Sequence, residues 1–153
     1  MATITAQLTV NSDISDYGLS INNTMTMNKA GTIEGLELTT GLHRKTYLST
    51  NQVDLLTAGS GRADAVTASK ANKLYIKNIG TSSTEYFTIG FGNSSGSGSH
   101  TASNGDATAF ELGRLYGGDF MIIPWLAVST TGDITIAPSV ATTMDVEYMA
   151  FHE

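Results

Sequence analysis

The segment Leu112-Gly-Arg-Leu-Tyr-Gly-Gly-Asp-Phe-Met-Ile-Ile-Pro-Trp125 decides the fold, because it holds two strand-like runs with only turn residues between them. Apolar residues alternate up to Tyr116, and two glycines then reverse the chain. Phe120 to Ile123 continues without a polar residue, which is typical of a strand covered on both faces. Pro124 cannot donate a backbone hydrogen bond, so this strand should end there or lie at an edge.

Similar short runs lie on both sides of this segment, and no stretch of helical period separates them. Leu74–Ile79 and Glu85–Phe91, separated by a loop of hairpin length over 80–84, resemble a hairpin. This pattern predicts a compact all-β, antiparallel β-sandwich. The further candidate strands are Thr46–Ser49, Val53–Leu56, Ala63–Ala68, Phe110–Tyr116, Phe120–Val128, Ile134–Ile136 and Met144–Phe151.

Residues 1–42 differ from the body predicted over 43–153. Four apolar residues alternate with polar ones at the start, and the rest of the segment is rich in Asn, Ser, Asp and Thr with isolated apolar anchors. Such a segment buries little surface alone, so we expect an N-terminal arm that contacts the body or a neighbouring subunit. An extra strand pair on the same sandwich is the alternative. The candidate contact residues of the arm are Ile4, Leu8, Ile14, Leu19, Ile21, Met25 and Met27.

The composition excludes several classes of function. Charged residues make up 14% of the chain, against about 25% in an average domain, while it contains 22 Thr and 15 Ser. With a net charge of −6 and scattered basic residues, nucleic-acid binding is not expected. The longest apolar run is too short to cross a membrane, and no secretory signal is visible at the N-terminus. Cysteine is absent, which is consistent with a reducing cytosol.

The residues that could carry chemistry do not cluster. His43, His100 and His152 lie in unrelated contexts without metal-ligand spacing. No G-x-S-x-G nucleophile motif is present. Asp145 and Glu147 share the face of a strand and are expected to point to solvent, where nothing would separate their pKa values. The sequence therefore predicts no enzyme, no catalytic residue, no metal site and no cofactor.

Two further groups of residues are candidates for contact with a partner. Trp125, with Arg114 and Tyr116 just upstream, predicts either an exposed interaction patch or a tryptophan that caps the core. Met149 and Phe151 make the charged face of the last strand apolar at its end, which suggests that another layer or another chain covers it. The Gly/Ser-rich segment 93–106 is either a flexible connection or a second contact.

Several of these runs resemble small virion proteins of tailed bacteriophages. The resemblance covers roughly residues 43–153 and rests on a "YIKN" strand, a step from Gly-Asp-aromatic into an apolar strand ending in Pro-Trp, and a closing "VEY" strand. No matching motif lies in the arm. The runs concerned are Asn72–Gly80, Glu85–Gly90, Leu112–Trp125, Asp133–Ile136 and Val146–Tyr148.

The resemblance implies a jelly-roll-like sandwich and a structural role. Members of that group are capsid decoration (cement) proteins, or they lie on tails and fibres, commonly as homotrimers. We therefore expect a protein assembled in the host cytoplasm that lies on the virion capsid surface and contacts itself and the major capsid protein, but neither nucleic acid nor membrane. The alternative is a receptor- or carbohydrate-binding module of a tail or fibre.

Overall fold

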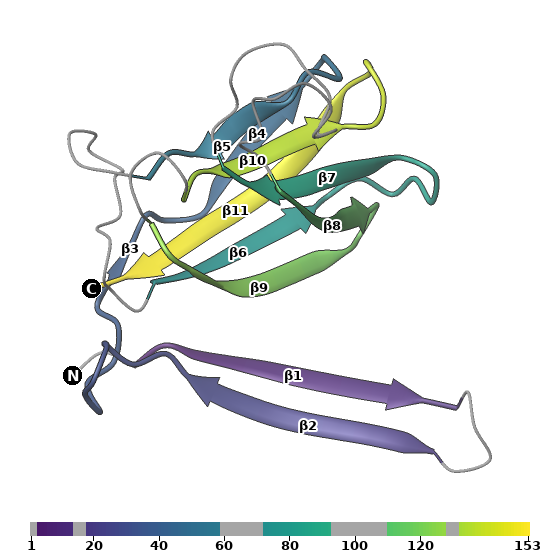
Figure 1. Ribbon diagram of the computed structural model, residues 1–153. Coiled ribbons are helices and arrows are strands. Elements are labelled where there is room, and N and C mark those ends of the chain that lie inside the picture. Colours follow the sequence, from purple (N-terminus) through teal and green to yellow (C-terminus); the bar gives the residue numbers. More distant parts are fainter. Residues whose placement is uncertain (1–2, 14–17, 59–71, 93–109, 128–131) are drawn as a thin grey trace.

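The computed structural model describes residues 3–13, 18–58, 72–92, 110–127 and 132–153, and strands are the only regular elements within them (Figure 1). The first two strands form the N-terminal arm, and the other nine form the body. The strands are β1 (Thr5–Ser12), β2 (Leu19–Thr26), β3 (Leu38–Thr39), β4 (His43–Tyr47), β5 (Val53–Leu56), β6 (Asn72–Asn78), β7 (Tyr86–Phe91), β8 (Phe110–Tyr116), β9 (Phe120–Trp125), β10 (Ile134–Pro138) and β11 (Met144–His152).

The body is a jelly roll of two antiparallel sheets. One sheet has the order β5-β10-β7-β8, and the other has the order β3-β11-β6-β9, with β4 paired to the first half of β11 beside β3. Taking β4 to β11 as the eight strands, the sheets are β4-β11-β6-β9 and β5-β10-β7-β8, which is the double Greek-key arrangement of jelly rolls. The predicted all-β, jelly-roll-like sandwich with an N-terminal arm is confirmed.

The predicted hairpin between the strands at 74–79 and 85–91 is wrong. β6 belongs to one sheet and β7 to the other, so the loop between them crosses from layer to layer. The Gly117-Gly118 reversal does the same between β8 and β9. A short loop reverses the chain equally well within a sheet and between two packed sheets, and its length does not distinguish the two cases.

Period-two alternation explains which faces are buried. In β6, Leu74 and Ile76 are fully buried, while Lys73, Tyr75 and Lys77, which alternate with them, are partly exposed. This is the pattern of a strand with one face in the core. The two inner faces together form the hydrophobic core, whose largest fully buried members are Trp125, Phe87, Leu74, Ile76, Ile89, Ile134, Ile136 and Val146.

β9 differs from its prediction. The apolar run from Phe120 suggested cover on both faces, but burial alternates along the strand, and Phe120 and Ile122 are exposed. The strand lies at the end of its sheet and pairs only with β6, and the exposure of these two side chains shows that its outer face is open within the described residues. Pro124 lies on this edge strand, as its missing N–H requires.

The turn between β8 and β9 is tied to the core by Asn78. The buried Asn78 amide donates to the carbonyl of Leu115 (3.0 Å), and its backbone oxygen accepts from the N–H of Gly118 (3.0 Å). Gly118 has φ of 89°, which favours glycine. Gly117 lies against the backbone of Ser82, and a Cβ there would come within 2.5 Å of the Ser82 oxygen. This turn therefore requires glycine at both positions for different reasons.

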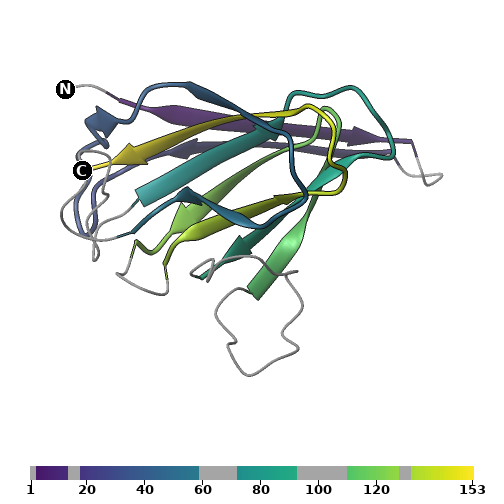
Figure 2. The ribbon, with the colours of Figure 1, turned by 90° about the horizontal axis from the view of Figure 1, so that it is seen from above.

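The arm projects beside the body and is joined to it at one end, near the C-terminus (Figures 1 and 2). β1 and β2 pair in register over their full length, from Thr5 with Thr26 to Ser12 with Leu19. After the arm, Leu38 and Thr39 form β3, which pairs with the end of β11. The last residues of the predicted arm segment therefore belong to a body sheet. The predicted strand Ala63–Ala68 and the segment 93–106 lie outside the described residues, as do Ile14 and His100.

Candidate association surface

The arm has one apolar and one polar face, because the register of the hairpin aligns the alternation of its two strands. Val10 pairs with Ile21 and Ala6 with Met25, so their side chains share a face. We call this the arm face; its apolar residues are Ala6, Leu8, Val10, Leu19, Ile21 and Met25, and the polar Asn23 and Ser12 lie among them, opposite Leu8 and Leu19. The opposite face is made of Thr, Gln, Asn and Ser, with hydrogen bonds from Gln7 to Asn22 (3.1 Å) and from Ser20 to Asn11 (2.9 Å).

The arm face is open to solvent. Leu8 and Leu19 are about half exposed, at 49% and 51%, and Val10, Ile21 and Met25 are also exposed. Neither β1 nor β2 contains a charged residue. Of the predicted contact residues, Leu8, Leu19, Ile21 and Met25 therefore lie together on one exposed surface, with Ile4 partly buried beside the start of β1. Val10 was not among the predicted contacts, although its alternation with Leu8 is visible in the sequence.

The base of the arm is fixed by a small buried cluster. Met27 and Leu36 are almost completely buried, and the N–H of Leu36 donates to the carbonyl of Met27 (2.7 Å). The N–H of Met27 in turn donates to the carbonyl of Ile4 (2.9 Å). Met27 was predicted to contact either the body or a neighbouring subunit; its side chain is buried within this chain and is not part of the exposed surface.

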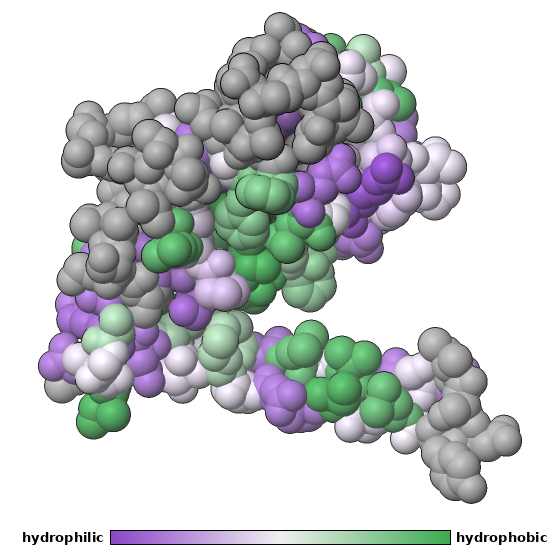
Figure 3. All heavy atoms as spheres, viewed as in Figure 1, coloured by the Kyte–Doolittle hydropathy of each residue, from purple (hydrophilic) through white to green (hydrophobic). Residues whose placement is uncertain are grey.

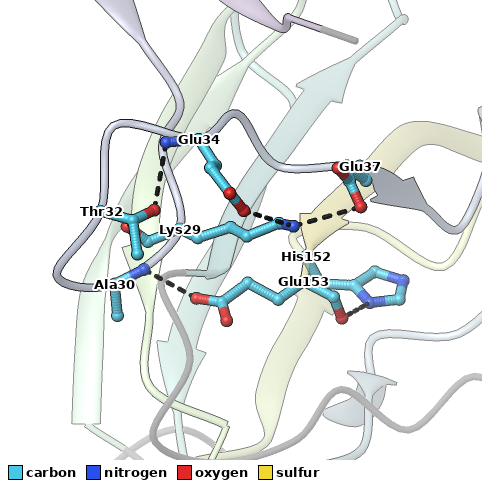
Figure 4. Close-up of polar contacts among 7 residues, drawn as sticks. All are labelled: Lys29, Ala30, Thr32, Glu34, Glu37, His152 and Glu153. Atoms are coloured by element: carbon cyan, nitrogen blue, oxygen red, sulfur yellow. Dashed lines mark hydrogen bonds and ion pairs between the residues drawn. The ribbon is translucent and has the colours of Figure 1, made fainter. Parts of the chain in front are cut away.

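Charged groups hold the same segment in place (Figure 4). The Lys29 ammonium lies 3.2 Å from a carboxylate oxygen of Glu37 and 3.3 Å from one of Glu34. Hydrogen bonds to Glu37 and then to Glu34 raise the pKa of Lys29 above its ordinary value. The N–H of Ala30 donates to a carboxylate oxygen of Glu153 (2.8 Å), which links the arm to the C-terminus. None of these charged groups was predicted, because their pairing depends on how the chain turns between β2 and β3.

A second group of exposed apolar residues lies on β8 and β9, the end strands of the two sheets. Phe110 is 74% exposed and Phe120 is 58% exposed. Figure 3 shows hydrophobic residues gathered both on the arm and on the part of the body where β8 and β9 lie, on the two sides of a hollow. We call this group the β8–β9 patch. It consists of Phe110, Leu112, Phe120 and Ile122; the exposed Tyr116 lies instead against Tyr86, on the outer side of the β7–β8 sheet.

Trp125 does not belong to this surface. It is 1% exposed, and its indole N–H donates to the carbonyl of Gly132 (2.6 Å), so it is part of the core. The exposed-patch interpretation of Trp125 is wrong, and the core alternative holds. Arg114 and Tyr116 are exposed, and both contact Tyr86: the guanidinium lies 4.5 Å from its ring centroid, and the two tyrosine rings are 5.1 Å apart. Met149 and Phe151 are partly exposed on the last strand.

Glu147 was predicted to point to solvent, and this is wrong. Its side chain is largely buried and accepts hydrogen bonds from Arg44 Nε (2.9 Å) and from the hydroxyl of Tyr75 (3.2 Å). Burial, followed by the charge of Glu147, raises the pKa of Tyr75. This network binds β4, β6 and β11 together on the outer side of their sheet. A carboxylate held by two donors in this way is a structural group.

The described residues contain no group of three or more His, Asp or Glu side chains placed to hold a metal ion. His43 stacks on Tyr148, with ring centroids 5.5 Å apart, and its Nε2 lies 2.7 Å from the carbonyl of Thr40. His152 lies at the end of β11. Within the same residues, no helix is long and apolar enough to span a membrane.

Comparisons with known proteins add little to these observations. No protein-family model matches the chain, and no curated protein matches it. Among solved structures, the chain is similar to the crystal structure of a Yersinia pseudotuberculosis-derived mitogen, with 12% sequence identity and a TM-score of 0.39. That similarity covers 74% of this chain and 85% of the mitogen chain. The fold of the chain therefore rests on its own strand order, and its function has to be argued from its surfaces.

Proposed function

We propose that the protein is a structural virion protein, a decoration or cement protein that stabilises a bacteriophage head through contacts between subunits. The observation that carries this proposal is the arm: a hairpin whose two strands contain no charged residue, projecting from a jelly-roll body, with its apolar face exposed. A monomeric protein rarely leaves such a surface open to water. Jelly rolls are common in viral capsid proteins, and the body carries the sequence resemblance to phage virion proteins.

Burial of apolar area between subunits supplies the stabilisation in this proposal, at about 25 cal/mol per Å². The partners are other copies of the chain, as a homotrimer, and the major capsid protein. The place of action is the outer surface of the capsid. The role needs no cofactor and no catalytic residue, because binding alone does the work.

The test is the position and copy number of the protein on purified particles. Antibody labelling in electron microscopy should place it over the whole head, and quantitative mass spectrometry should find it in hundreds of copies per particle. A few copies at one vertex would instead indicate a tail or fibre module, for which lectin-type jelly rolls provide a precedent. Absence from the particles would refute both virion roles.

The contribution of the arm to capsid binding can be tested with the full chain. Leu8→Thr with Ile21→Thr removes apolar area from the arm face and keeps residues that favour strands. Gln7→Thr with Asn22→Thr is the matched control on the polar face of the same hairpin. Cosedimentation with particles that lack the protein should be lost for the first variant and kept for the second. Equal capsid binding by both variants would show that the arm face makes no contact with the shell or between subunits.

A further inference from the structure

We propose that the arm of one copy packs its apolar face on the β8–β9 patch of a second copy, so that the chain forms a closed oligomer by exchanging arms. This inference deepens the proposed role by naming the surfaces through which the subunits contact each other. It can nevertheless be tested on the purified protein alone. A failure of arm exchange is therefore distinguishable from a failure of the virion role.

The arm needs a partner on energetic grounds. A two-stranded hairpin is marginally stable in water unless its apolar face packs on another layer. Within the described residues β1 pairs only with β2, so no third strand supports the pair. The buried cluster at Met27 and Leu36 and the Lys29 ion pairs fix the base of the arm. They hold it beside the body, with its apolar face on one side of the hollow (Figure 3).

A second copy fits the arm face better than a charged partner. The strands β1, β2 and β9 contain no charged residue, so the arm face offers no ion pair to an acidic or basic partner; on the body, Glu111 and Arg114 of β8 are the charged neighbours of the patch. The β8–β9 patch presents the complementary surface: aromatic and aliphatic side chains on the end strands of both sheets. Pro124 on β9 cannot donate to an added strand, which favours packing of side chains over extension of the sheet.

The areas agree with a closed oligomer. From the exposed fractions, and with about 150–250 Å² for a large side chain, the arm face and the β8–β9 patch each expose on the order of 400 Å². One arm-to-patch contact would bury roughly 800 Å², which is less than the roughly 1,600 Å² of a standard stable interface. In a symmetric dimer or trimer every subunit gives one arm and receives one, so closure doubles the buried area per subunit. Closure therefore brings the contact into the range of stable assemblies.

The first experiment measures the oligomeric state of the purified full chain by analytical ultracentrifugation. Wild-type protein should be a dimer or trimer at micromolar concentration. Leu8→Thr with Ile21→Thr, and separately Phe120→Thr with Ile122→Thr, should each raise the dissociation constant by about 100-fold. The polar-face control, Gln7→Thr with Asn22→Thr, should associate as wild type. Far-UV circular dichroism checks that every variant keeps the sheet signal. A monomeric wild type, or association unchanged in either apolar variant, would overturn the proposal.

The second experiment identifies which surfaces meet, and it uses the absence of cysteine from the chain. A variant with Leu8→Cys is mixed with a variant with Phe120→Cys under mild oxidation, and a mixed disulfide dimer is expected. Thr9→Cys, on the polar face, replaces Leu8→Cys as the control and should not crosslink. If the two cysteines are placed in one chain and crosslink only within that chain, the arm folds back on its own body and the proposal fails.

Discussion

Removing the side chain of Trp125 tests whether the core of the jelly roll is assembled as described. Truncating a fully buried tryptophan to alanine costs about 3–5 kcal/mol through lost packing and the cavity left behind. Trp125 is 1% exposed and packs in the core, so Trp125→Ala should fall in the upper half of that range. The loss is large compared with a total stability of about 5–15 kcal/mol for a natural domain.

Trp125→Phe separates packing from hydrogen bonding. Phenylalanine keeps most of the apolar area but leaves the buried carbonyl of Gly132 without the indole donor, which should cost about 1–3 kcal/mol. Leu126→Ala is the control, because Leu126 follows Trp125 in the chain, is exposed and belongs to neither the arm face nor the β8–β9 patch, so its loss should cost below about 1 kcal/mol.

Urea denaturation followed by far-UV circular dichroism measures all three variants. Fluorescence is unsuitable because Trp125 is the only tryptophan in the chain. The expected order of destabilisation is Trp125→Ala, then Trp125→Phe, then Leu126→Ala. If Trp125→Ala and Leu126→Ala lost the same small free energy, the assignment of Trp125 to the core would be refuted.

Three further perturbations probe the turn, the alkaline limit and the base of the arm. Gly117→Ala places a Cβ within 2.5 Å of the Ser82 oxygen and should cost about 1–3 kcal/mol in urea denaturation; Gly113→Ala, which meets nothing within 4 Å, should change stability little, and equal losses would contradict the close approach. Burial raises the pKa of Tyr47 above its ordinary 10.0, so the folded state holds that proton longer than the unfolded chain, and the contribution of Tyr47 to stability should be constant below pH 10.0 and fall above it. Tyr47→Phe should reduce this alkaline fall without loss at neutral pH, because the buried hydroxyl has no hydrogen-bond partner within the described residues; an unchanged alkaline slope would argue against this role. Lys29→Met removes both ion pairs and should speed hydrogen exchange of the backbone amides between β2 and β3 without changing exchange in the core strands. Equal exchange rates between β2 and β3 in Lys29→Met and in the wild type would show that the ion pairs do not hold the arm.

The strands could be predicted from the sequence because their alternation is local information. Leu74 and Ile76 alternate with polar or amphipathic residues, and the structure places a strand there. The partners of each strand could not be predicted. β10 lies between β5 and β7, and β11 lies between β4 and β6, and only the closure of the two layers decides this order. The mistaken hairpin between β6 and β7 has the same cause.

The candidate surface was predicted in part. The arm residues Leu8, Leu19, Ile21 and Met25 were identified because apolar residues stand out in a polar segment. The β8–β9 patch was missed because an apolar run such as Phe120 to Ile123 has the same sequence whether a layer covers it or not. Glu147 differs from expectation, and the choice between patch and core could not be made for Trp125, for a related reason: their hydrogen-bond partners, Arg44 and Gly132, are brought to them by distant or irregular parts of the chain.

The pairing of β4 with β11 has a consequence for how the chain acquires its structure during synthesis. Arg44 and Glu147 are 103 positions apart, so β4 cannot pair with β11 until that intervening length of chain has been synthesised. Proteins dominated by such distant contacts fold slowly. The arm is translated before the body, and its apolar face stays exposed throughout this delay, when neighbouring nascent chains on one polysome are closest to each other. Subunit recognition and aggregation thus compete for the arm face, and the rate at which β11 pairs with β4 decides which of the two prevails.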